Sequence, residues 1–152
     1  MRLFVDTNII LEYIEHRREY DHVRSILAAI RDGKHHAIIS QGCVYTLAYL
    51  IEKSLKANNI HKPELTKHLR RLMTIVLNMV RPVGISYEDM IKAIDNDSFT
   101  DLEDSFQYQC ALENHCDVLL TINIDDFANA DQQQLQVLTP AQFVKTYLKT
   151  ER

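Results

Sequence analysis

Carboxylates crowd the segment Asp101–Phe127, DLEDSFQYQCALENHCDVLLTINIDDF, which contains five Asp and two Glu. The segment has the pattern of a helix followed by a buried strand, with acids at both ends of the pair. Like charges held close together repel each other, so such a cluster needs either open solvent or a bound cation. Clusters of oxygen ligands suit Mg²⁺ or Mn²⁺, which bind through a few carboxylates and keep several waters.

The elements that must position these acids alternate along the chain. Short apolar runs predict strands, and longer runs with helical spacing predict the helices between them. This alternation predicts a parallel sheet with helices on both faces, in which ligands bind at the carboxyl ends of the strands. The predicted strands are residues 2–6, 36–40, 80–85, 117–121 and 135–139.

Three places along the chain bring acids to this edge of the predicted sheet. Asp6 follows the run RLFV, and Asp126 follows VLLT by a few residues. Asp101 and Asp104 lie three apart at the start of the helix that leads into VLLT, and therefore on one helical face. Because connections between elements are short, we expect all four carboxylates to converge.

Each of these acids also has a structural explanation. Asp6 could cap the helix that follows it, and Asp126 could cap a short turn. Asp101 and Asp104 could complement the positive end of their helix dipole. The convergence of acids from three separate strand exits or helix starts favours the metal site over these single explanations.

Length and composition limit the class of protein. The 152 residues suit one domain spanning 1–152, with 46% hydrophobic and 25% charged residues. A net charge of −4 gives no global basic field. Three cysteines without a C-x-x-C pair indicate a reducing compartment. The start MRLFVDTN is no signal peptide and no apolar run reaches the ~20 residues of a membrane helix, so we predict a cytoplasmic protein with no membrane partner.

The motifs VDTNIIL, D-S-F-Q-Y-Q-C-A-L starting at Asp104, and LLTINIDDF resemble PIN-domain nucleases, which include the VapC-type toxins of bacterial toxin–antitoxin pairs. The resemblance runs over essentially the whole chain, to the VLTPAQFV ending. It implies a three-layer α/β/α sandwich around a parallel sheet and a phosphodiesterase site dependent on Mg²⁺ or Mn²⁺. It also implies an RNA substrate, an antitoxin protein as partner and, because family members often dimerise, a homodimer.

The resemblance assigns roles residue by residue. The first family acid corresponds to Asp6, the acid that opens the late helix to Asp104, and the extra acid one turn earlier to Asp101. Asp6 and Asp104 are then metal ligands, and Asp126 holds a second ion or orients the attacking water. The polar companion of the first family acid corresponds to Asn8. The family's T-x-N/D-x-x-D-F turn corresponds to Thr121, Asn123, Asp126 and Phe127. Asn8 and Asn123 are predicted to contact the phosphate or a metal-bound water.

One position departs from the family pattern. The family usually carries a Glu about six residues beyond the Ser that ends the second strand, and here that position is Thr46. Glu52 lies a further six residues along, roughly 120° around the helix, and cannot replace it. Thr46 is therefore predicted to face the substrate without a charge. This departure motivates an alternative function, a PIN-like protein that binds RNA or a partner without cleaving RNA.

Substrate attraction and one further alternative complete the predictions. Lys67, Arg70 and Arg71 recur at helical spacing and could follow a phosphate backbone, although a solvated helix face explains them equally simply. A phosphotransferase with Asp6 as nucleophile, of the haloacid-dehalogenase type, would need an acid two residues later. Asn8 occupies that position, which disfavours this third function.

Overall fold

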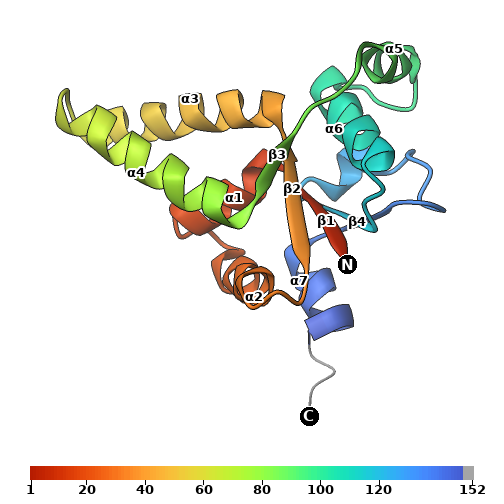
Figure 1. The fold of residues 1–152 in the computed structure, drawn as a ribbon, viewed down its shortest axis with the longest axis horizontal. Coiled ribbons are helices and arrows are strands. Elements are labelled where there is room, and N and C mark those ends of the chain that lie inside the picture. Colours follow the sequence, from red (N-terminus) through yellow and green to blue (C-terminus); the bar gives the residue numbers. More distant parts are fainter. Residues whose placement is uncertain (149–152) are drawn as a thin grey trace.

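Five short strands form one parallel sheet in the computed structural model, which describes residues 1–148 (Figure 1). Their order across the sheet is β3-β2-β1-β4-β5, so the first strand lies at the centre. Parallel pairing brings every strand's carboxyl end to the same edge. The strands are β1 (Arg2–Val5), β2 (His36–Ser40), β3 (Arg81–Val83), β4 (Val118–Leu120) and β5 (Gln136–Leu138).

The three inner strands β1, β2 and β4 are largely buried, and their alternate side chains enter two separate cores. Leu3 and Val5 join the larger core, whereas Phe4 between them joins the smaller one. Phe4 pairs with Ile38 on one neighbouring strand and with Leu119 on the other. This two-sided burial explains why the strands have nearly continuous apolar sequences.

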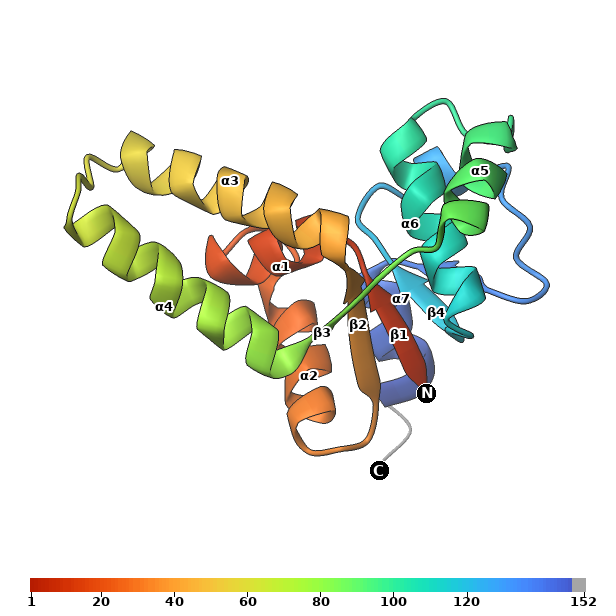
Figure 2. The same cartoon turned by 45° about the horizontal axis from the view of Figure 1, so that its top comes forward.

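Helices cover both faces of the sheet, which confirms the predicted α/β/α sandwich (Figures 1 and 2). The larger core is closed by α1 (Thr7–Ile14), α2 (Tyr20–Arg31), α3 (Gln41–Ala57), α4 (Glu64–Met79) and α7 (Pro140–Phe143). The smaller core is closed by α6 (Leu102–Glu113), against which α5 (Tyr87–Asp95) packs. A 3₁₀ turn, η1 (Ile124–Phe127), follows β4, and a π-helical turn, η2 (Val144–Leu148), follows α7.

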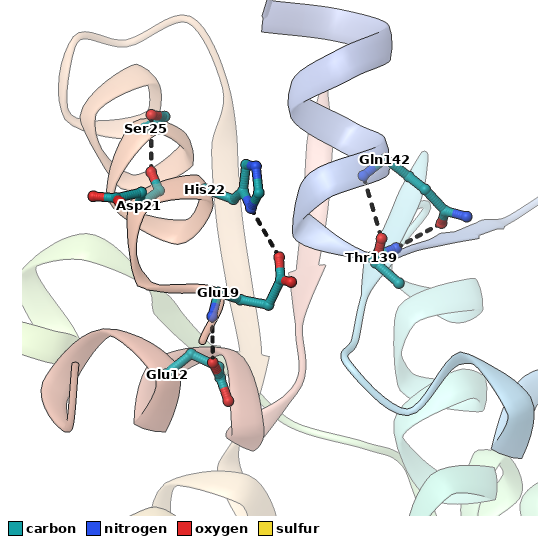
Figure 3. A network of polar contacts seen from close by, with 7 residues as sticks. All are labelled: Glu12, Glu19, Asp21, His22, Ser25, Thr139 and Gln142. Carbon is teal, nitrogen blue, oxygen red and sulfur yellow. Dashed lines mark hydrogen bonds and ion pairs between the residues drawn. The ribbon is translucent and has the colours of Figure 1, made fainter. Parts of the chain in front are cut away.

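Local hydrogen bonds fix where the helices begin. Ser40 ends β2 and caps α3, because its hydroxyl accepts the N–H of Cys43. Thr139 and Gln142 form a reciprocal capping box at the start of α7 (Figure 3). The buried carboxylate of Glu12 accepts the N–H of Glu19 at 2.8 Å and so joins α1 to the start of α2 (Figure 3).

Two helix ends differ from what the sequence pattern predicts. The helical pattern TNIILEYIEHR extends to residue 17, but α1 ends at Ile14 and the chain then turns through His16 with a positive φ of 49°. The pattern PELTKHLRRLMTIVLNMV predicts Pro63 in the first turn of a helix, and Pro63 instead precedes α4. Gly33 does follow the second helix with a φ of 76°, a conformation that suits glycine.

The helical hairpin α3–α4 extends away from the sheet, on the side opposite α5 and α6 (Figures 1 and 2). Helix α3 leaves from the carboxyl edge of the sheet at Ser40, and α4 returns to the amino edge at Arg81. Within residues 1–148, no helix combines the length and the apolar character needed to cross a membrane.

Candidate metal-binding site at the carboxyl edge of the sheet

Asp6 stands at the centre of the carboxyl edge, between strands remote in sequence. Its backbone N–H donates to the Leu120 carbonyl at 3.0 Å, continuing the pairing of β1 with β4. Its side chain is 3% exposed, and its Oδ2 accepts the hydroxyl of fully buried Thr121 at 2.8 Å. Although Asp6 occupies the position before α1, its side chain makes no capping hydrogen bond. The carboxylate of Asp6 is thus not a complete helix cap, although the backbone N–H groups of Asn8 and Thr7 also act to lower its pKa.

Burial shapes the protonation of Asp6. Removal from water raises the pKa of this carboxyl above its ordinary value, and the hydrogen bond from Thr121 opposes the rise. A polar contact with the Gln107 side chain on α6 also opposes it. The structure thus keeps a buried carboxyl with a fixed orientation at the point where β1, β4 and α6 meet.

Asp104 lies in the first turn of α6 and is half-buried. Burial, followed by the nearby charges of Asp101, Asp6 and Asp126, raises the pKa of Asp104 to about 7. The other three predicted acids therefore lie close enough to Asp104 for their charges to raise its pKa. A carboxyl that keeps its proton near neutral pH marks a place where another negative charge is costly and a cation is favoured.

Asp101 has a visible structural role. It precedes α6, and its Oδ1 accepts the N–H of Glu103 at 2.8 Å and of Asp104 at 3.4 Å. These are the bonds of a helix cap. Asp126, in η1, is exposed. Asp101 thus positions the helix that carries Asp104, and its charge adds to the crowding around that carboxyl.

Two residues at this edge were missed by the sequence analysis. Glu103 is exposed, yet partial burial and then the charges of Asp101 and Asp6 raise the pKa of its carboxyl. Gln107 is 3% exposed, and its Oε1 is buried without a hydrogen-bond partner. Their spacing of four residues puts both on one face of α6, a signal that becomes useful only once the orientation of the helix is known.

The PIN domain family model matches residues 2–125, most of the chain and all but one of the predicted acids. The chain belongs to the PIN-domain family.

One curated relative and two solved structures that resemble this PIN domain are named VapC or VapBC. The chain is 27% identical to Ribonuclease VapC1 of Aquifex aeolicus (strain VF5) over 150 residues, covering 96% of this chain and 95% of the relative. Its fold resembles VapBC2 from Rickettsia felis, solved bound to a promoter DNA fragment, with a TM-score of 0.67, 17% identity and coverage of 91% and 98%. VapBC-1 from nontypeable Haemophilus influenzae gives a TM-score of 0.58, 15% identity and coverage of 93% and 99%. These two likenesses concern the fold.

The three uncharged residues predicted to face the substrate lie on three different segments of the chain, and the hydroxyl of Thr46 is hydrogen-bonded within its own helix. Asn8 is half-buried in the first turn of α1. Asn123 is exposed, and its backbone N–H donates to the Thr121 hydroxyl at 3.0 Å. The Thr46 hydroxyl donates to the Gly42 carbonyl at 3.4 Å, so its hydrogen bond is made within α3.

The predicted basic residues are not brought to the acids of this PIN domain. Lys67, Arg70 and Arg71 are exposed on α4, which lies across the molecule from α6 (Figure 1). Lys67 pairs with Glu64 on the same helix at 3.3 Å. Their placement agrees with the simpler explanation, a solvated helix face.

The donor chemistry at the edge fits a hard divalent cation. Among residues 1–148, no three His, Cys, Asp or Glu side chains stand close enough together to hold a metal ion. Carboxylates with no cation between them repel, and Mg²⁺ needs only one or two of them because it keeps its waters. The buried Gln107 Oε1, an oxygen without a partner beside Asp6, is the kind of acceptor that a metal-bound water would satisfy.

Proposed function

We propose that this PIN-domain protein is a Mg²⁺- or Mn²⁺-dependent endoribonuclease and the toxin of a bacterial toxin–antitoxin pair. The single observation that carries the proposal is the buried carboxylate of Asp6, oriented by Thr121 at the carboxyl edge of the sheet and close enough to Asp104 for the two charges to interact. Membership of the PIN family and the relative named Ribonuclease VapC1 support an RNA substrate. The VapBC complexes of similar fold support an antitoxin partner.

Each side chain has a defined task in this proposal. Asp6 and Asp104 would hold the metal, and Thr121 would keep Asp6 in place through its hydrogen bond. When bound, the metal lowers the pKa of a water ligand and offsets negative charge on the phosphodiester. Asp126, exposed on η1, would orient the attacking water, while Asn8 and Asn123 would hydrogen-bond the phosphate.

Protein partners have candidate surfaces on the same molecule. Large apolar side chains are exposed on α3, where Tyr45 is 79% and Tyr49 is 63% exposed, and on α5, where Tyr87 is 73% exposed. Exposed aromatic residues are typical of the centres of protein interfaces. These surfaces would serve an antitoxin or a second copy of the chain, in the cytoplasm.

The test is cleavage of RNA by the purified protein in Mn²⁺, with EDTA as the metal-free control. We expect internal cleavage that needs Mn²⁺ and that falls to the EDTA level in Asp6→Asn and Asp104→Asn. Wild-type cleavage by Asp104→Asn, or cleavage in EDTA, would overturn the site assignment. RNA binding with no cleavage under any of these conditions would support the non-cleaving alternative, which Thr46 motivated.

A further inference from the structure

Helix α6 presents two rows of side chains to the edge of the sheet. The first row is Glu103, Gln107 and Cys110, spaced four and three residues apart and therefore on one face. The Cys110 Sγ lies 3.8 Å from the Gly84 carbonyl, just after β3. The first row therefore faces the half of the sheet that carries β2, β3 and the start of α3.

The second row faces the opposite half. It consists of Asp104, Tyr108 and Ala111. The Tyr108 hydroxyl donates to the Asp131 carbonyl at 2.6 Å, in the segment between η1 and β5. Asp104 consequently looks toward η1 and Asp126, whereas Glu103, its neighbour in sequence, looks toward α3.

Position 46 lies on α3, on the side of the site that the row of α6 containing Glu103 faces. Thr46 lies one turn beyond Cys43 on α3, and its hydroxyl is bonded to its own helix. Glu103 lies close enough for its charge to act on both Cys43 and Asp6. Glu103 therefore lies on the face of α6 that Cys110 turns toward the end of β3, the side from which a glutamate at position 46 on α3 would approach.

The buried oxygen of Gln107 is an independent observation that points to a ligand on this side of the cluster. The side chain of Gln107, one turn below Glu103, contacts Asp6, yet its buried Oε1 has no hydrogen-bond partner among residues 1–148. A buried acceptor without a partner costs about 1–3 kcal/mol, so native structures generally satisfy it. A hydrated cation beside Glu103 would do so through one of its waters.

We propose that Glu103 on α6 supplies the carboxylate that position 46 on α3 lacks, and so completes the divalent-metal site. The inference rests on the proposed function for the identity of the metal. A carboxylate from Glu103 on α6 would also explain why a working metal site tolerates Thr46, because the negative charge is supplied by α6 and not by α3. Glu103 is exposed, as a ligand at an open edge is before the cation binds.

The competing explanation is that Glu103 only complements the positive end of its helix, and the chain contains a matched control. Glu88 is the second residue of α5, as Glu103 is the second residue of α6, and it is exposed. We would measure Mn²⁺ binding to metal-free protein by calorimetry for wild type, Glu103→Gln and Glu88→Gln. We expect Glu103→Gln to weaken Mn²⁺ affinity by about 10–100-fold, a range typical of groups that support a metal site. Glu88→Gln should bind Mn²⁺ like wild type.

The reciprocal variant tests the exchange between helices. Thr46→Glu introduced into Glu103→Gln should recover most of the lost Mn²⁺ affinity. Unchanged affinity in Glu103→Gln, an equal loss in Glu88→Gln, or no recovery in the double variant would each overturn the proposal. The outcome is separable from the ribonuclease proposal, because binding is measured without RNA. Glu103-dependent Mn²⁺ binding by a protein that never cleaves RNA would contradict the ribonuclease proposal alone. Mn²⁺-dependent cleavage that Glu103→Gln leaves unchanged would contradict this inference alone.

Discussion

Asp6 and Asp104 show how one sheet edge holds two carboxyls by different means. Asp6 is almost fully buried, and the Thr121 hydroxyl orients it. Asp104 is half-buried, and this burial, followed by the charges of the surrounding acids, raises its pKa to about 7. The ordinary value for this carboxyl is 3.8, so the folded chain keeps a proton that the unfolded chain releases in between. Under the proposed function, a cation bound at this edge would offset the repulsion between these carboxyls.

The raised pKa of Asp104 should make the stability of the metal-free protein depend on pH. Because the folded pKa of Asp104 is raised, the metal-free protein loses stability as the pH rises from about 4 through about 7. Asp104→Asn removes the cost of ionising this carboxyl, so in EDTA at about pH 8 it should melt higher than wild type and show a smaller decrease with pH. Thermal melts in EDTA at about pH 5 and pH 8 measure both effects. A lower melting temperature for the variant at pH 8 would contradict the charge crowding.

Thr121 should be the sensitive partner of Asp6. Thr121→Val keeps the shape of the side chain but removes the hydroxyl that donates to Asp6 Oδ2. A buried acceptor left without its donor costs about 1–3 kcal/mol, and we expect that loss in the free energy of unfolding measured with urea. Thr139→Val, which removes the cap of α7 but no hydrogen bond to Asp6, is the matched comparison. Only Thr121→Val should also weaken Mn²⁺ binding.

At the scale of elements, α6 carries the site and Asp101 fixes its start. Asp101→Ala should lower the free energy of unfolding by about 0.5–2 kcal/mol, because the N–H groups of Glu103 and Asp104 lose their acceptor. Asp101→Ser should restore the stability, since serine is also a good cap. RNA cleavage by Asp101→Ser at the wild-type rate would limit Asp101 to capping. Lost cleavage in a variant of normal stability would give its carboxylate a chemical role.

The sequence predicts elements better than it predicts their rotation. Strand exits are visible in the chain, so Asp6 and the turn after β4 could be assigned to the carboxyl edge in advance. Glu103 could not be assigned in the same way. Six of the twelve residues of α6 are buried, several of them polar, so the helix has no simple apolar stripe to show which side faces Asp6. Its rotation is decided by packing, including the contact of Cys110 with Gly84.

Over the whole molecule, basic side chains concentrate at the amino edge of the sheet, opposite the edge that gathers the acids. The amino edge has a cavity of about 940 Å³ lined by Arg2, Arg31 and Arg81 together with His35 and His36, and no acid among residues 1–148 lines it. Two acids stand next to it, because Asp117 accepts the backbone N–H of Arg2 and Asp32 pairs with Arg31. Burial, then the positive N-terminus, Lys34 and His36, lowers the pKa of His35. We expect a polyanion to approach the metal-free protein at this cavity.

RNA binding in EDTA should therefore depend on Arg81 more than on the basic residues of α4. Within residues 1–148, Arg81 and Arg70 are both exposed and neither forms an ion pair, so Arg70→Ala is a matched comparison for Arg81→Ala. If Arg81 contacts one phosphate, its removal should reduce the slope of log affinity against log salt by about 0.7, the value for single strands. Fluorescence anisotropy with a labelled RNA, titrated across salt concentrations, measures the slope for each variant. A reduced slope in Arg70→Ala together with an unchanged slope in Arg81→Ala would place the RNA along α4 and the helical hairpin, because each slope counts the phosphates that its arginine neutralises.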